Sequence, residues 1–194
     1  TCALPIFDAL VHSVESMLSP NSTPYTRMFG YEAMKMIISG YKAVAEAGPA
    51  GSPERRIKRN ELMRDFLIAS DYAGISFDTG GCAAVHALSY QLGGKYHVPH
   101  GESNYAMFTG VLRNYMEIKP EGEILKMNQF IADILGCDVA DVYDALETLI
   151  NKLLPKKALH EYGVTEQDLP EFADRVIKTQ ERLMKNCFVP LDYD

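Results

Sequence analysis

The chain lacks the features that would mark a membrane-embedded, secreted or nucleic-acid-binding protein. No apolar run reaches the roughly 18 residues that a membrane-spanning helix requires. The first residues also lack the basic and then apolar stretch of a signal peptide. The formal net charge is −7, which disfavours binding to the phosphate backbone of nucleic acids. We therefore expect neither a membrane nor a nucleic acid as a partner.

Cysteine is scarce. The four cysteines, Cys2, Cys82, Cys137 and Cys187, show no C-x-x-C spacing, which fits a reducing compartment better than a disulfide scaffold. We therefore expect a cytoplasmic protein. The first residue is threonine and helix signals begin almost at once, so we expect the chain to be a piece of a longer protein.

Strand patterns are missing from the sequence. No segment combines apolar–polar alternation with hairpin turns, whereas apolar residues recur at helical spacing between short breaks. Gly48-Pro49, Gly80-Gly81 and Gly93-Gly94 are predicted to end helices. The pattern predicts a single all-α domain over residues 1–194, a bundle of about seven to nine helices.

Capping signals place individual helices. Thr23-Pro24 suits the N-cap and the first turn of a long helix. Ser52-Pro53 opens the next helix, which we expect to continue through Ile75. The segment Thr165–Asp168 resembles a capping box for a last helix that reaches Lys185.

Two glycine-rich phosphate-binding motifs are absent as well. The sequence contains no G-x-G-x-x-G after a strand and no G-x-x-x-x-G-K-[ST]. The chain by itself therefore offers no dinucleotide or phosphate cradle of these two kinds.

Histidine is rare, and its placement suggests a metal site. Asp8 and His12 are four residues apart, so on a helix their side chains lie on the same face. His86 and His100 bracket a helix-like stretch that contains a Gly-Gly pair. Three imidazoles and a carboxylate suit Zn²⁺ or Fe²⁺. A simpler interpretation stays open, because an i, i+4 Asp–His pair is also a common surface contact on helices.

Three segments carry a family resemblance. Asp8–Glu15 has the pattern D-A-x-x-H-x-x-E, and His86–Gly93 has the pattern H-x-x-x-x-x-L-G. Pro99–Gly101 reads Pro-His-Gly. With these segments, the whole chain resembles the C-terminal domain of the iron-containing, group III alcohol dehydrogenases. The resemblance implies one divalent metal ion, usually Fe²⁺ and in some members Zn²⁺. Its implied ligands are Asp8, His12, His86 and His100.

The resemblance also implies an N-terminal α/β domain, absent from this chain, that binds NAD. The active site would lie in the cleft between the two domains. We expect the chain alone to be inactive and the full-length enzyme to be a homo-oligomer. Within the family, segments such as Ala83–Tyr90 and Tyr96–Glu102 most resemble the 4-hydroxybutyrate dehydrogenase branch. This narrower resemblance implies an alcohol or aldehyde substrate that carries a carboxylate, namely 4-hydroxybutyrate and succinic semialdehyde.

Tyr90 is the candidate catalytic residue. It follows His86 by one helical turn, so it could face the metal site and relay the alcohol proton or pack against nicotinamide. The alternative is a core tyrosine, and many family members carry a histidine at this position. Glu15 follows His12 by one turn and is expected either to orient His12 or to lie on the exposed helix surface.

Several other basic residues have no assigned role. His97 lies shortly before His100 in a predicted loop and either supports the metal site or is exposed. Four basic residues are candidates for binding a substrate carboxylate, namely Lys95, Lys156, Lys157 and His160. Residues of these types are more often solvated at the surface.

Two rival interpretations remain. Another metal-dependent enzyme of related architecture, such as a glycerol dehydrogenase or a dehydroquinate synthase, would match fewer of the four ligand positions. A non-catalytic helical interaction module would bind no stoichiometric metal and would use an apolar surface patch instead.

Overall fold

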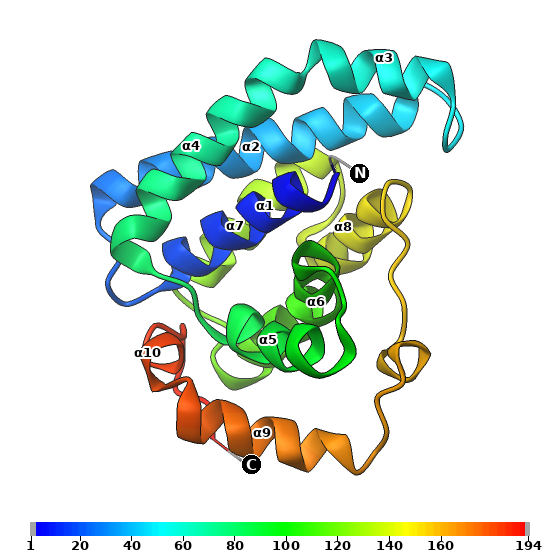
Figure 1. Cartoon of the computed structure of the whole chain (residues 1–194). Helices are drawn as coiled ribbons and strands as arrows, with labels where there is room; N and C mark the ends of the chain where they lie inside the picture. Colours follow the sequence, from blue (N-terminus) through cyan, green and yellow to red (C-terminus); the bar gives the residue numbers. More distant parts are fainter. Residues whose placement is uncertain (1–2, 193–194) are drawn as a thin grey trace.

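Ten α-helices and two short 3-10 helices make up the regular structure, for which a computed structural model describes residues 3–192 (Figure 1). No strand occurs among these residues, so the predicted all-α fold is confirmed. The helices are α1 (Ala3–Leu18), α2 (Pro24–Glu46), α3 (Pro53–Glu61), α4 (Met63–Gly80), α5 (Ala84–Tyr96), α6 (His100–Ile118), α7 (Glu123–Leu135), η1 (Val139–Asp141), α8 (Val142–Asn151), η2 (Leu159–Tyr162), α9 (Asp168–Thr179) and α10 (Glu181–Met184).

The described residues hold more α-helices than predicted, because two helices expected to be continuous are divided. The backbone leaves helical geometry at Leu62, with φ −87° and ψ 1°, and this residue separates α3 from α4. Gln180, with φ −112° and ψ 27°, separates α9 from α10. Neither break contains proline or glycine, so neither carried a sequence signal.

Helix α1 lies at the centre of the molecule. It packs against α2, α4 and α6 (Figure 1). Its side chains Phe7, Leu10 and Val14 are buried, and Phe7 makes edge-on ring contacts with Tyr105 and Phe108 of α6. A helix that is apolar on nearly all sides is stable only when neighbours cover it. The helices packed around α1 therefore hold its polar side chains in fixed positions.

The crossing of α1 and α4 is unusually close. A Cβ atom added to Gly80 would lie 2.3 Å from the carbonyl oxygen of Ser16. The Ser16 and Ser76 hydroxyls also form a buried hydrogen bond of 2.7 Å between these two helices. The missing side chain at Gly80 thus sets the distance at which the two backbones pack.

The predicted helix ends are partly correct. Thr23 caps α2 as expected, with its hydroxyl accepting from the backbone N–H of Thr26. Helix α4 ends at Gly80, and Gly81 takes a left-handed φ of 76°. The prediction that Gly93-Gly94 ends a helix is wrong, because α5 continues through both glycines. It ends at Tyr96, and His97 adopts the left-handed conformation with φ 55°.

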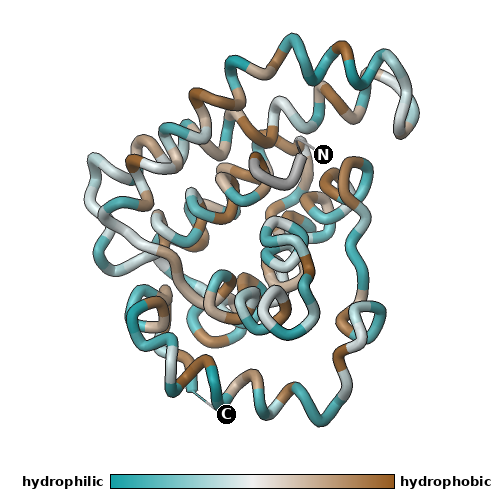
Figure 2. Tube along the Cα trace, viewed as in Figure 1, coloured by the Kyte–Doolittle hydropathy of each residue, from teal (hydrophilic) through white to brown (hydrophobic). Residues whose placement is uncertain are grey.

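Helices α9 and α10 cover one side of α5 (Figure 1). Hydrophilic and hydrophobic stretches alternate along α9 (Figure 2), and its apolar residues Phe172 and Val176 are buried. Among residues 3–192, no helix is long and apolar enough to span a bilayer.

Candidate metal centre

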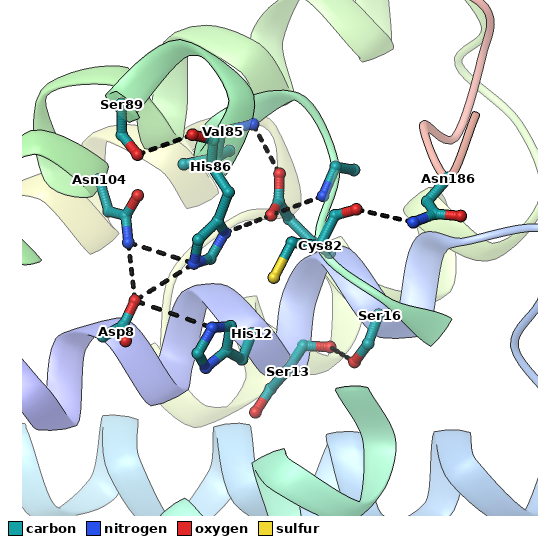
Figure 3. Close-up of polar contacts among 12 residues, drawn as sticks. Asp8, His12, Ser13, Ser16, Cys82, Val85, His86, Ser89, Asn104 and Asn186 are labelled. Atoms are coloured by element: carbon teal, nitrogen blue, oxygen red, sulfur yellow. Dashed lines mark hydrogen bonds and ion pairs between the residues drawn. The ribbon is translucent and has the colours of Figure 1, made fainter. Parts of the chain in front are cut away.

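Two side chains interrupt the buried surface of α1. From Ile6 to Ser19, every residue is buried except Asp8 and His12. One helical turn separates the pair, so both lie on the same side of α1 as predicted. The distance from Asp8 Oδ1 to His12 Nε2 is 4.0 Å. The central helix therefore presents a polar edge toward His86 and Asn104 (Figure 3).

The other two predicted ligands come from α5 and α6, which pack side by side. His86 lies in the first turn of α5 and is 1% exposed, whereas His100 begins α6 with a side chain that is 46% exposed. Each ring directs Nε2 to Asp8 Oδ1, at a distance of 3.3 Å in both cases. The structure thus brings the three predicted histidines to within 4.0 Å of Asp8 Oδ1.

The spacing of three of these donor atoms suits a single ion. Two atoms bound tetrahedrally at about 2.1 Å from one zinc ion lie roughly 3.4 Å apart, and His86 Nε2 and His100 Nε2 each lie 3.3 Å from Asp8 Oδ1. The ligand atoms of Asp8, His86 and His100 all lie within 4.8 Å of one another, whereas His12, at 4.0 Å from Asp8 Oδ1, groups in this way with Cys82 and His86. The rings of His12 and His86 are parallel, with centroids 4.6 Å apart. Imidazole nitrogen and carboxylate oxygen are donors that Zn²⁺ and Fe²⁺ accept. The residues present therefore fit the implied group.

Glu15 orients His86 rather than His12. Its carboxylate is 3% exposed and lies 2.6 Å from His86 Nδ1. It also accepts hydrogen bonds from the backbone N–H groups of Ala83, at 3.0 Å, and Val85, at 2.6 Å. These groups lie at the start of α5, where free N–H donors favour a negative charge. Of the two roles expected for Glu15, orienting His12 and exposed surface, neither is the one observed.

Asn104 is a central residue that the sequence did not single out. Its side chain is buried, and its Nδ2 lies 2.7 Å from Asp8 Oδ1. The same nitrogen is 3.4 Å from His86 Nε2 and 3.3 Å from His100 Nε2. Its Oδ1 is buried without a hydrogen-bond partner among the described residues. Its position one helical turn after His100 was the available signal.

Burial and charged neighbours shift the pKa values of His86, Asp8 and His12. Burial opposes the charged form of His86, but contacts with Asp8, Cys82 and Glu15 outweigh burial and raise its pKa to about 12. Burial also opposes ionisation of Asp8, yet hydrogen bonds with His100 and His86 hold its pKa well below the usual range. Burial lowers the pKa of His12. The carboxylates of Asp8 and Glu15 flank the two ring nitrogens of His86. This arrangement favours a positive charge at the ring.

A cleft of about 330 Å³ opens beside these side chains, and Tyr90 is one of the residues that line it. The Tyr90 ring lies nearly parallel to that of His100, with centroids 5.8 Å apart. Tyr90 is 40% exposed, and partial burial raises the pKa of its hydroxyl. The residue thus faces the cleft with a protonated hydroxyl, and its catalytic role stays a prediction.

The other basic residues considered from sequence do not line this cleft. Lys95 pairs with Asp168, Lys156 pairs with Glu147, and Lys157 pairs with Glu102. Two histidines are exposed elsewhere, on η2 and at the end of α5. They are His160 and His97.

A family profile and a relative of known activity each match nearly the whole chain. The profile of the Fe-containing alcohol dehydrogenase family, C-terminal, matches residues 3–193. The chain is 47% identical over 183 residues to a 4-hydroxybutyrate dehydrogenase from Clostridium kluyveri. The alignment covers 94% of this chain and 47% of that protein.

Two solved structures share the fold. A crystal structure of a 1,3-propanediol oxidoreductase has a TM-score of 0.78 at 24% identity, covering 98% of this chain and 48% of that one. A sulfoacetaldehyde reductase from Bifidobacterium kashiwanohense, in complex with NAD⁺, has a TM-score of 0.75 at 21% identity. That match covers 98% of this chain and 46% of the reductase. The chain spans about half the length of the relatives it matches.

Proposed function

Because the chain belongs to the Fe-containing alcohol dehydrogenase family and matches its C-terminal part, we propose that it supplies the metal centre of an NAD-dependent alcohol dehydrogenase. The observation that carries this proposal is the convergence of His86 and His100 on Asp8 Oδ1, with His12 on the same face of α1. These four residues would hold one Fe²⁺ or Zn²⁺ ion.

When bound, such an ion supplies Lewis-acid polarisation of an alcohol or carbonyl oxygen, and NAD supplies the hydride acceptor. The chain's own residues prepare the site. Glu15 accepts a hydrogen bond from His86 Nδ1 and thereby leaves Nε2 to face Asp8. Buried helices around α1 fix the ligand positions before substrate arrives.

We assign Tyr90 the contact with the reacting oxygen or with the nicotinamide ring. The raised pKa of its hydroxyl means that it keeps its proton near neutral pH. Tyr90 would therefore donate a hydrogen bond to an oxygen in the cleft rather than remove a proton as a base. Its position beside His100 supports this role.

The substrate pair that we propose is 4-hydroxybutyrate and succinic semialdehyde. The 47% identity to a 4-hydroxybutyrate dehydrogenase supports this choice. We propose that an N-terminal domain outside this chain binds most of the NAD, since the chain covers about half of its relatives and one of them is an NAD⁺ complex. We also propose that the full-length enzyme is a homo-oligomer located in the cytoplasm.

The experiment is a turnover assay of the full-length protein that contains this chain. We expect NAD⁺-dependent oxidation of 4-hydroxybutyrate that stops after treatment with a chelator and returns with added Fe²⁺ or Zn²⁺. Turnover that survives complete metal removal would contradict the proposal. A protein that oxidises 1,3-propanediol but not 4-hydroxybutyrate would keep the enzyme class and overturn the substrate.

A further inference from the structure

Arg182 of α10 lines the cleft that contains the candidate metal ligands and Tyr90. Its side chain is exposed, and it forms no ion pair within residues 3–192. The only other charged residue of the cleft outside the ligand set is Asp78, which also makes no ion pair in the described part of the chain. A guanidinium group is therefore present in the cleft without a protein carboxylate bound to it.

The backbone of Arg182 is tied to the loop that precedes His86. Asn186 donates from Nδ2 to the carbonyl oxygen of Cys82, at 2.9 Å (Figure 3). The same nitrogen donates to the carbonyl oxygen of Arg182, at 3.2 Å. Asn21 in turn donates to Asn186 Oδ1 at 2.9 Å. A Cβ atom at Gly81 would lie 2.5 Å from Asn186 Nδ2, so glycine allows this close approach. The start of α10 is thus fixed relative to the candidate metal centre.

Arg182 lines the same cleft as Tyr90 and the candidate metal ligands. By contrast, Lys95, Lys156 and Lys157 are paired with carboxylates away from this cleft. Arg182 is the one lysine or arginine among the residues lining it in the described structure.

We propose that Arg182 binds the carboxylate of the substrate and so sets the preference for a hydroxy acid over an uncharged alcohol. This inference rests on the proposed function. The planar guanidinium donates two parallel hydrogen bonds to a carboxylate, a geometry that an ammonium group does not reproduce. In 4-hydroxybutyrate the carboxylate and the carbinol carbon are at opposite ends of a short chain. Arg182 would hold the first end while the second lies at the metal centre.

The test compares two substrates in the full-length, metal-loaded enzyme. One is 4-hydroxybutyrate, and the other is butane-1,4-diol, which has the same carbon chain without the charge. For Arg182→Gln we expect KM for 4-hydroxybutyrate to rise about 10- to 100-fold, since hydrogen bonds to charged groups are of that strength. The kcat/KM for the diol should stay within about twofold. Arg182→Lys should restore part of the loss.

Lys185→Gln is the matched control, because Lys185 is exposed directly after α10 and does not line the cleft. It should behave as the wild type with both substrates. Equal losses on the acid and the diol in Arg182→Gln would overturn the inference, as would a change confined to KM for NAD⁺. A wild type that oxidises the diol but not the acid would overturn the proposed substrate together with this inference. A wild type active on the acid with an unchanged Arg182→Gln variant would overturn the inference alone.

Discussion

Glu15 links two structural tasks at the scale of a single residue. Its carboxylate satisfies N–H groups at the start of α5 and also accepts from His86 Nδ1. Partners of this kind fix the tautomer and the ring orientation of a metal-binding histidine. One buried side chain on α1 therefore positions both a helix and a candidate ligand.

Replacing this carboxylate with an amide tests that role. For Glu15→Gln we expect metal affinity to fall about 10- to 100-fold, since the neutral amide supports His86 less well. Competition with a chelator of known affinity, under anaerobic conditions, measures the change. Glu117→Gln, at an exposed position near the far end of α6, is the control and should bind metal as the wild type does. Unchanged affinity in folded Glu15→Gln would show that Glu15 serves α5 alone.

Residue patterns predicted part of this site. The i, i+4 spacing of Asp8 and His12 and the Pro-His-Gly motif at His100 identified residues that do lie together. Spacing could not show that Glu15 faces α5, because that depends on how two helices pack. It also could not identify Arg182, which lies far from Asp8 in the sequence and joins the cleft through tertiary structure.

At the scale of helices, the α1–α4 crossing depends on the glycine at the end of α4. Gly80→Ala should lower the free energy of unfolding by about 1–3 kcal/mol, because the added methyl group meets the backbone of Ser16. Gly74→Ala is the matched control on the same helix, where an added Cβ meets nothing within 4 Å. That variant should be neutral or more stable by about 0.5–1 kcal/mol. Urea unfolding measures both, and equal stabilities would disprove the close-packing argument.

A charged cluster joins α9 to the end of α5. Asp168 accepts from Lys95 at 2.5 Å, from the backbone N–H of Thr165 at 2.7 Å and from Tyr96 at 2.8 Å. Lys95, first among these partners, holds the pKa of Asp168 well below its usual range. The unfolded chain, with an aspartate pKa of about 3.9, then takes up the proton first as the pH falls. The stabilisation is complete above that pH and is lost progressively below it.

Thermal unfolding across pH tests this cluster. Asp168→Asn should lower Tm at pH 7, and the difference from the wild type should shrink as the pH falls below about 4. Asp133→Asn, on the exposed face of α7, should leave Tm unchanged both at pH 7 and below about pH 4. A difference for Asp168→Asn that is constant with pH would contradict an ionised Asp168 as its source.

At the scale of the whole molecule, the site lies where distant parts of the chain meet. Helix α1 supplies Asp8 and His12, α5 supplies His86, and α6 supplies His100. Arg182 of α10 is among the residues that line the cleft. Periodic apolar residues and glycine–proline breaks were enough to predict the all-α class. They could not predict the divisions at Leu62 and Gln180, which no breaker residue marks.

The metal content of the full-length protein tests the central claim most directly. The protein would be loaded anaerobically with Fe²⁺, and separately with Zn²⁺, and analysed for bound metal beside the variants His86→Ala and His100→Ala. His160→Ala, at an exposed position outside the cleft, is the control. We predict one metal ion per chain in the wild type and the control, and its loss in both variants. Stoichiometric metal retained in both variants, or no metal in the wild type, would contradict the account.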